Sequence, residues 1–111
     1  MCSEEELQTI LRRIREKSVE LFGDLLDAVI LYGSYARKTQ DSESDIDVMI
    51  RVRLSKAELE AYQSEISVLA SRLGLEYDVF VSPHLQDCET FEAWKNVLPF
   101  FKNVAREGIE V

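Results

Sequence analysis

The chain has 111 residues, 46% of them hydrophobic, and carries a net charge of −8. This composition supports a folded core and argues against disorder, and no apolar run reaches the roughly 18 residues of a membrane span. Because duplex nucleic acid is bound by basic surfaces, the acidic charge argues against a nucleic-acid clamp. Cys2 and Cys88 are too few for a disulfide framework, and the acidic N-terminus does not resemble a secretory signal. We therefore expect a single cytoplasmic domain over residues 1–111.

The first part of the chain predicts a helix, a strand and a long polar loop. Ser3 and Glu6 form a capping-box pattern for a helix that ends at Gly23. Residues 27–32 form a short apolar run typical of a buried strand. The polar segment 33–44 follows, and a loop of this length inside a small domain usually carries function.

The second part predicts three more strands and three helices. Residues 45–53 alternate between polar and apolar with a period of two, which predicts a strand. Ser55 and Glu58 start a helix that ends near Gly74, and residues 75–81 again alternate as a strand. Helices over 87–97 and 98–107 and a short strand at 109–111 complete the chain. This order predicts an α/β fold, a small mixed β-sheet packed with helices.

A pair of aspartates is the main candidate for chemistry. Asp45 and Asp47 are two residues apart on a predicted strand, so their side chains leave the same face about 6.6 Å apart. Two such carboxylates repel each other unless a cation lies between them. Asp78 lies in the predicted strand 75–81 and approaches the pair if the two strands are neighbours. Three aspartates favour Mg²⁺ or Mn²⁺.

A candidate anion-binding turn precedes the aspartates. Gly33 and Ser34 directly follow the strand 27–32, and glycine lets a phosphate approach the backbone closely. Arg37 and Lys38 lie one helical turn further on and can neutralise phosphate charge. A metal-binding acidic pair beside an anion-binding turn suits a metal–triphosphate substrate. The same segment does not match the P-loop, because the second glycine of that motif is missing here. It does not match the EF-hand calcium loop either, because the glycine at the sixth position of that loop is missing.

The sequence GSYARKTQDSESDID resembles a family motif. It has Gly33-Ser34, ten intervening residues and then Asp45-x-Asp47, as in the minimal nucleotidyltransferases of the DNA polymerase beta superfamily. The closing segment REGIEV at 106–111 also resembles the end of those proteins. The resemblance implies a polymerase beta-like nucleotidyltransferase fold. Many members have glycine where this chain has Lys38, which puts the conformation of the loop in question.

The resemblance also implies a reaction and a partner. Asp45 and Asp47 would hold two Mg²⁺ ions, Asp78 would bind one of them and help to deprotonate the acceptor, and Gly33 and Ser34 would hold phosphates of ATP. Short members of the family are paired with a HEPN-domain ribonuclease toxin. There the nucleotidyltransferase is the antitoxin in a hetero-oligomer, and it can transfer AMP to a tyrosine of the toxin.

Other interpretations stay open at this stage. The domain can act as a non-catalytic binding module that neutralises its partner by complex formation, or as an enzyme that modifies a small molecule or an RNA end. The aspartate pair can be a solvated edge strand, although aspartate is disfavoured in strands. We expect His84 to be exposed without function. The aromatic residues of the C-terminal helices are expected to pack in the core, with an exposed partner-binding patch as the alternative: Phe91, Trp94, Phe100 and Phe101.

Overall fold

The computed structural model describes residues 2–111, and its order of elements is mostly that of the predicted fold. Two short 3₁₀ turns, at Gly23–Leu25 and Glu60–Tyr62, adjoin the helices. The helices and strands are α1 (Glu4–Phe22), β1 (Leu26–Tyr32), α2 (Ser34–Arg37), β2 (Ile46–Val52), α3 (Lys56–Leu59), α4 (Gln63–Tyr77), β3 (Val81–Asp87), α5 (Cys88–Trp94), α6 (Pro99–Glu107) and β4 (Ile109–Glu110).

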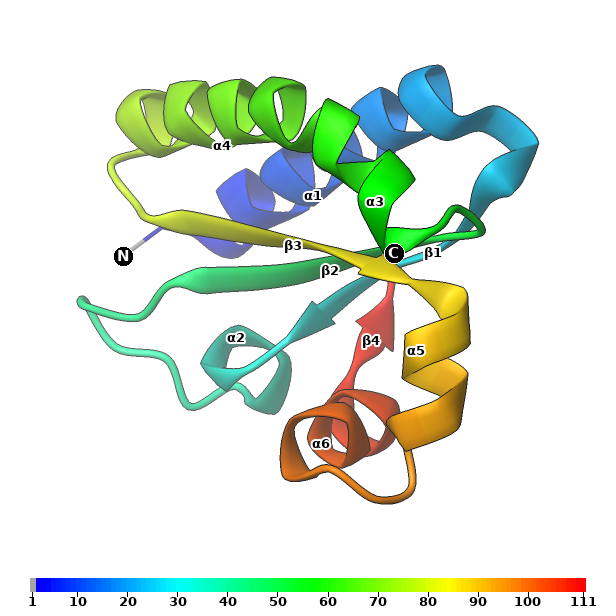
Figure 1. The fold of residues 1–111 in the computed structure, drawn as a ribbon. Coiled ribbons are helices and arrows are strands. Elements are labelled where there is room, and N and C mark those ends of the chain that lie inside the picture. Colours follow the sequence, from blue (N-terminus) through cyan, green and yellow to red (C-terminus); the bar gives the residue numbers. More distant parts are fainter. Residues whose placement is uncertain (1) are drawn as a thin grey trace.

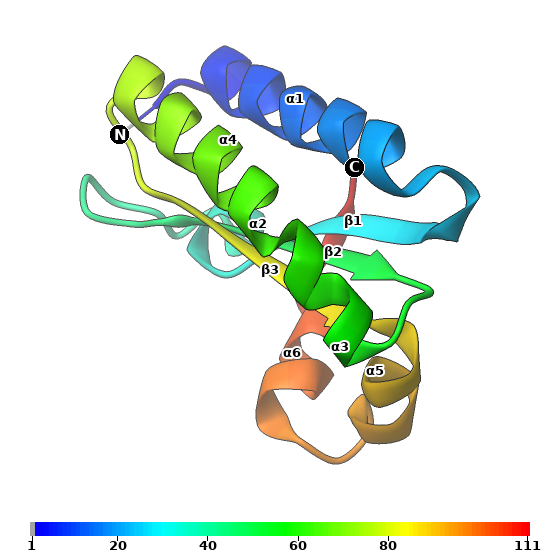
Figure 2. The ribbon, with the colours of Figure 1, turned by 45° about the horizontal axis from the view of Figure 1, so that its top comes forward.

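The four strands form one mixed sheet in the order β3-β2-β1-β4. β1 pairs antiparallel with both β2 and β4, whereas β2 pairs parallel with β3. Helices α1 and α4 cover one face of the sheet, and α5 and α6 cover part of the other, so the fold has three layers (Figures 1 and 2). The predicted small mixed sheet packed with helices is confirmed. None of the helices within residues 2–111 combines the length and the hydropathy that crossing a membrane requires.

Successive side chains along the strands point to opposite faces of the sheet, and this alternation divides the core into two parts. Val48 and Ile50 of β2 face α1 and α4, together with Val29 of β1. Met49 faces the other side, where it packs with Phe91 of α5 and other buried side chains. The period of two in the sequence therefore predicted correctly that Asp45 and Asp47 point away from the larger cluster.

Local signals fixed the helix starts. Ser3 accepts a hydrogen bond from the backbone N–H of Glu6, and Ser55 accepts one from Glu58, which completes both predicted capping boxes. Asp87 caps α5 by accepting from the Thr90 N–H at 2.8 Å. Each side chain satisfies an N–H group that a helix start otherwise leaves without a partner.

The predicted strand over residues 75–81 is wrong. Helix α4 continues past Gly74 to Tyr77, because Tyr77 lies four residues after the buried Leu73 and packs against the same core. Asp78 ends the helix in the left-handed conformation, at φ 52°, and its N–H bonds the Gly74 carbonyl. The strand begins only at Val81.

Pro83 lies inside β3, beyond residue 81, where the predicted strand ends. The Ile46 N–H donates to the Phe80 carbonyl at 2.8 Å, which fixes the parallel ladder at its start. In such a ladder alternate residues bond the neighbouring strand, so Pro83 directs its nitrogen toward the open edge of the sheet. A proline without an N–H is tolerated there because no ladder bond is lost.

Candidate active site

The aspartate pair lies where β2 begins. Asp47 is the second residue of β2 and is half-buried, whereas Asp45 directly precedes the strand and is exposed. Ile46 and Val48, on the opposite face, are fully buried in the core. The burial of these two residues fixes the direction of both carboxylates, so the pair lies together on one face, as predicted from the sequence.

Gly33 brings the end of β1 against this pair. Its backbone has φ 77° and ψ −156°, a conformation that is nearly restricted to glycine. A Cβ atom at this position would overlap the Oδ2 atom of Asp47. Tyr32 is paired with Asp47 across β1 and β2, and Ser34 begins α2. Glycine at residue 33 is therefore required both by the backbone turn and by the proximity of the carboxylate.

The electrostatics of the pair show an unbalanced negative charge. Burial raises the pKa of Asp47, the nearby Asp45 raises it further, and the positive charge of Arg37 opposes both effects only in part. Burial and the charge of Asp47 raise the pKa of Tyr32 to about 12. A bound cation would relieve this repulsion.

A divalent cation fits the donor set. Mg²⁺ is usually bound by one or two carboxylates together with phosphates of the substrate, and less often by a cage of protein ligands alone. Asp45 and Asp47 supply two carboxylates on one face, and the backbone of the Gly33 turn lies directly against Asp47. The pair is therefore suited to a metal ion that arrives with a triphosphate.

Asp78 is not where the sequence predicted it. It caps α4 in an exposed turn and does not lie in a strand beside β2. Within residues 2–111 no three His, Cys, Asp or Glu side chains are grouped so that they could hold one metal ion. The predicted three-aspartate cluster is thus replaced by a pair. The turn with Asp78 nevertheless leads into β3 at the end of the sheet where Asp45 lies.

Arg37 and Lys38 occupy different positions relative to the pair. The Arg37 Nη1 atom lies 3.1 Å from Glu107 Oε2 at the end of α6, and the hydrogen bond from Arg37 lowers the pKa of Glu107. Arg37 therefore shares its charge between Glu107 and the aspartate pair. Lys38 ends α2 in the left-handed conformation, at φ 60°. This explains why glycine is suited to that position.

The structure adds residues to the site face that the sequence analysis did not assign to it. Ser82 is paired with Asp47 and His84 with Met49 across β2 and β3. The ring of Phe100, from α6, lies 5.6 Å from Tyr32 and 5.7 Å from His84 between centroids. His84 is exposed, as expected. Knowing the correct strand boundaries would have revealed Ser82 and His84, since both are at even positions of β3.

The aromatic residues of the C-terminal helices are divided between core and surface. Phe91 is buried and lies 5.8 Å from Phe101 between ring centroids, as core packing predicts. Trp94 and Phe100 are 45% and 42% exposed, so the core interpretation is wrong for these two.

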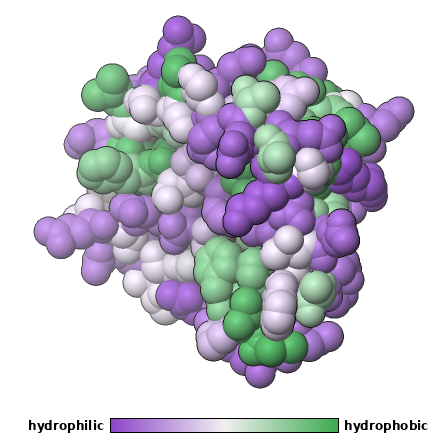
Figure 3. Space-filling view, viewed as in Figure 1, coloured by the Kyte–Doolittle hydropathy of each residue, from purple (hydrophilic) through white to green (hydrophobic). Residues whose placement is uncertain are grey.

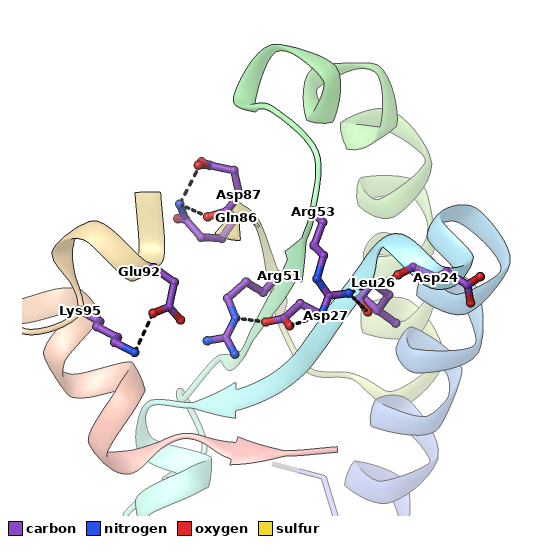
Figure 4. A network of polar contacts seen from close by, with 9 residues as sticks. All are labelled: Asp24, Leu26, Asp27, Arg51, Arg53, Gln86, Asp87, Glu92 and Lys95. Atoms are coloured by element: carbon purple, nitrogen blue, oxygen red, sulfur yellow. Dashed lines mark hydrogen bonds and ion pairs between the residues drawn. The ribbon is translucent and has the colours of Figure 1, made fainter. Parts of the chain in front are cut away.

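A second polar cluster, at the far end of the sheet, is structural. Asp27 accepts from Arg51 Nε at 2.7 Å and from Arg53 Nη2 at 2.8 Å (Figure 4). The Arg51 guanidinium also lies 4.3 Å from the centroid of the Phe91 ring. These contacts tie β1, β2 and α5 together where β1 begins and β2 ends, away from Gly33 and Asp47.

A mixed sheet that presents two carboxylates beside a glycine turn places the protein in the class of nucleotidyl-transferring enzymes. The chain belongs to the nucleotidyltransferase domain family, whose model matches residues 11–107. A relative in Methanocaldococcus jannaschii, named "Putative protein adenylyltransferase MJ0141", is 40% identical over 70% of this chain and 77% of its own length. A second protein of that organism, MJ1305, has the same designation and is 43% identical over 42% of this chain and 32% of its own length.

The solved structures that are similar to this chain include two of toxin–antitoxin proteins. One is a mutant of the MntA–HpeT toxin–antitoxin, with 21% identity over 90% of this chain and 70% of that chain, at a TM-score of 0.48. The other is a toxin–antitoxin with AMP-PNP, with 22% identity over 88% of this chain and 69% of that chain, also at 0.48.

Proposed function

We propose that this nucleotidyltransferase transfers AMP from ATP to a hydroxyl group of a partner protein, with Mg²⁺ or Mn²⁺ as the metal. The observation that carries the proposal is the Asp47 carboxylate against the Gly33 turn, with Asp45 close enough to raise the pKa of Asp47. The protein adenylyltransferase designation of the relative MJ0141 supports a protein acceptor.

In the proposed reaction the acceptor oxygen forms a bond to the α-phosphorus of ATP, and the bond from that phosphorus to pyrophosphate breaks. Two divalent ions, when bound, would neutralise the charge on the phosphate oxygens. Asp45 and Asp47 are the residues that would hold these ions. Gly33 leaves room for the phosphates, the Ser34 hydroxyl donates to them, and Arg37 contributes positive charge at the same turn.

We propose further that the partner is a HEPN-domain toxin in the cytoplasm, which this chain neutralises as an antitoxin in a hetero-oligomer. The support for this proposal is the resemblance of the Gly33-Ser34 and Asp45-x-Asp47 motif to the short members of the family. Binding without transfer is the competing function. The exposed side chains Trp94, Val97 and Phe100 are suited to such binding, since they are 45%, 60% and 42% exposed.

The role of Asp78 stays a prediction. If its carboxylate is needed as a ligand or as the base that accepts the acceptor proton, Asp78→Asn and Asp78→Gly both lose transfer. Asparagine and glycine are both compatible with the left-handed conformation at this position. If Asp78 only caps α4, both variants keep the transfer rate of the wild type.

The decisive experiment is a transfer assay on the protein encoded by the neighbouring gene, which we expect to be the HEPN-domain partner. Purified chain, Mg²⁺, ATP and that neighbour are incubated, and the neighbour is weighed by intact-mass spectrometry. We expect a gain of one or more AMP units, and no gain with Asp45→Asn or Asp47→Asn. A stable complex without any mass gain would favour the binding function. Labelled ATP with RNA and aminoglycoside acceptors tests the small-molecule and RNA alternatives.

A further inference from the structure

Phe80 is a large apolar side chain that the fold leaves in water beside the aspartate pair. Its ring is 79% exposed, although the next residue, Val81, packs against the core. The Phe80 carbonyl accepts from the Ile46 N–H at 2.8 Å, so Phe80 lies next to the residue between the two aspartates. In Figure 3 a hydrophobic area covers the region where Figure 1 shows the turn between α4 and β3.

The order of the strands separates two sides of the site. The aspartate pair lies at the start of β2, and β2 lies between β1 and β3. Gly33 adjoins Asp47 from β1, and Phe80 adjoins the start of β2 from the β3 side. In phosphoryl transfer the attacking and leaving oxygens lie roughly in line on opposite sides of the phosphorus. If the leaving phosphates occupy the Gly33 turn, the acceptor must approach from the side of Phe80.

The surroundings of Phe80 also restrict the kind of acceptor. Two carboxylates adjoin Phe80, and neither forms an ion pair with any residue in the range 2–111: Asp78 lies two residues before it, and Asp45 is next to its hydrogen-bond partner Ile46. Two divalent ions and a triphosphate, when bound, would largely cancel each other's charge, so the carboxylates beside Phe80 would keep this entrance acidic. A partner segment with basic residues is complementary to it, and an apolar side chain of that segment can cover the Phe80 ring.

We propose that Phe80 is a specificity-determining residue that binds the protein acceptor. It contacts an apolar side chain next to the acceptor hydroxyl, in a segment that also carries Lys or Arg. The proposal rests on the function proposed above, and it assigns the β3 side of the site to the acceptor and the β1 side to the nucleotide.

Steady-state kinetics of AMP transfer to the acceptor protein identified by the transfer assay test the proposal. We expect Phe80→Ala to raise the KM for the acceptor about tenfold, as truncation of an interface aromatic does. The KM for ATP and kcat should change less than about twofold, and Phe80→Leu should have a smaller effect. Leu25→Ala is the control, since it removes an exposed apolar side chain just before β1, at the end of the sheet away from Asp47. Urea unfolding of each variant checks that the fold is intact.

The outcomes separate the two proposals. An unchanged acceptor KM in Phe80→Ala overturns the role of Phe80 while the transfer reaction stands. A higher KM for ATP instead shows that the ring stacks on the nucleobase and also overturns it, as does an equal effect of Leu25→Ala. If the wild type transfers no AMP to the acceptor under any condition, the proposed transfer function itself is wrong, and the role of Phe80 that depends on it is wrong as well.

Discussion

Replacing Gly33 by alanine tests whether the turn and the aspartate pair form one unit. The backbone at Gly33, with φ 77° and ψ −156°, is strained for any other residue, at about 1–3 kcal/mol. The new Cβ would also overlap Asp47 Oδ2. Overpacking of this kind costs about 1–3 kcal/mol, and we expect the lower end because the carboxylate can turn away. The total of about 2–4 kcal/mol is a large part of the stability of a small domain.

Gly23→Ala is the matched control for backbone strain. Gly23 also has a positive φ, 54°, but a Cβ there would have nothing within 4 Å. Urea unfolding should therefore show that Gly33→Ala loses about 1 kcal/mol more than Gly23→Ala. Adding Asp47→Ala to Gly33→Ala should recover that excess, because the overlapping oxygen is gone. Equal losses for the two glycine variants, or no recovery in the double variant, would refute the close contact.

The same variants connect the turn to function. Turning the Asp47 carboxylate away from Gly33 displaces a proposed metal ligand. We therefore expect Gly33→Ala to lose both AMP transfer and the thermal stabilisation by Mg²⁺, whereas Gly23→Ala keeps both. Retention of full transfer by Gly33→Ala would show that the orientation of Asp47 is unimportant for the reaction.

Three further changes have defined outcomes. Mg²⁺ at about ten times its Kd should stabilise the wild type by about 1.4 kcal/mol, which raises Tm by about 6 °C. Without metal, Asp47→Asn should be more stable than the wild type, and its Tm should not change when Mg²⁺ is added. Differential scanning calorimetry with and without Mg²⁺ measures the Tm of both proteins. Lys38→Gly should add about 0.5–1 kcal/mol in urea unfolding by relieving the left-handed conformation, and Lys38→Ala should add nothing. Burial raises the pKa of Asp87, but hydrogen bonds from Thr90 outweigh it and leave that pKa lowered. A lowered pKa contributes stability that is present above about pH 4 and is lost as the pH falls further. Asp87→Asn should thus be less stable than the wild type at pH 7 by about 0.5–1 kcal/mol, and the difference should be smaller at pH 3. An equal difference at both pH values would show that the Asp87 charge is not the cause of the lost stability.

The helix starts and the candidate site followed from short-range patterns. Capping at Ser3 and Ser55 depends on residues only three positions apart, so the sequence contains the whole interaction. The common direction of Asp45 and Asp47 follows from the period of a strand once Ile46 and Val48 are known to be apolar. The turn at Gly33 was also predictable from neighbouring residues, because Gly33 and Ser34 directly follow the apolar strand 27–32.

The end of α4 was not predictable in this way. Residues 75–81 alternate like a strand, yet Tyr77 is also at helical spacing from Leu73, so local preferences do not decide between the two. Packing of Tyr77 against the core and the left-handed cap at Asp78 decide for the helix. As a result Asp78 moves out of the predicted metal cluster.

The sequence by itself determined the kind of site, because the residues that define it are neighbours along one turn and one strand. The tertiary structure alone decided what surrounds that site. The parallel pairing of β3 with β2 joins segments more than thirty residues apart and places Phe80 beside the aspartates. Such pairing depends on the packing of the whole core, which no local pattern in the sequence encodes.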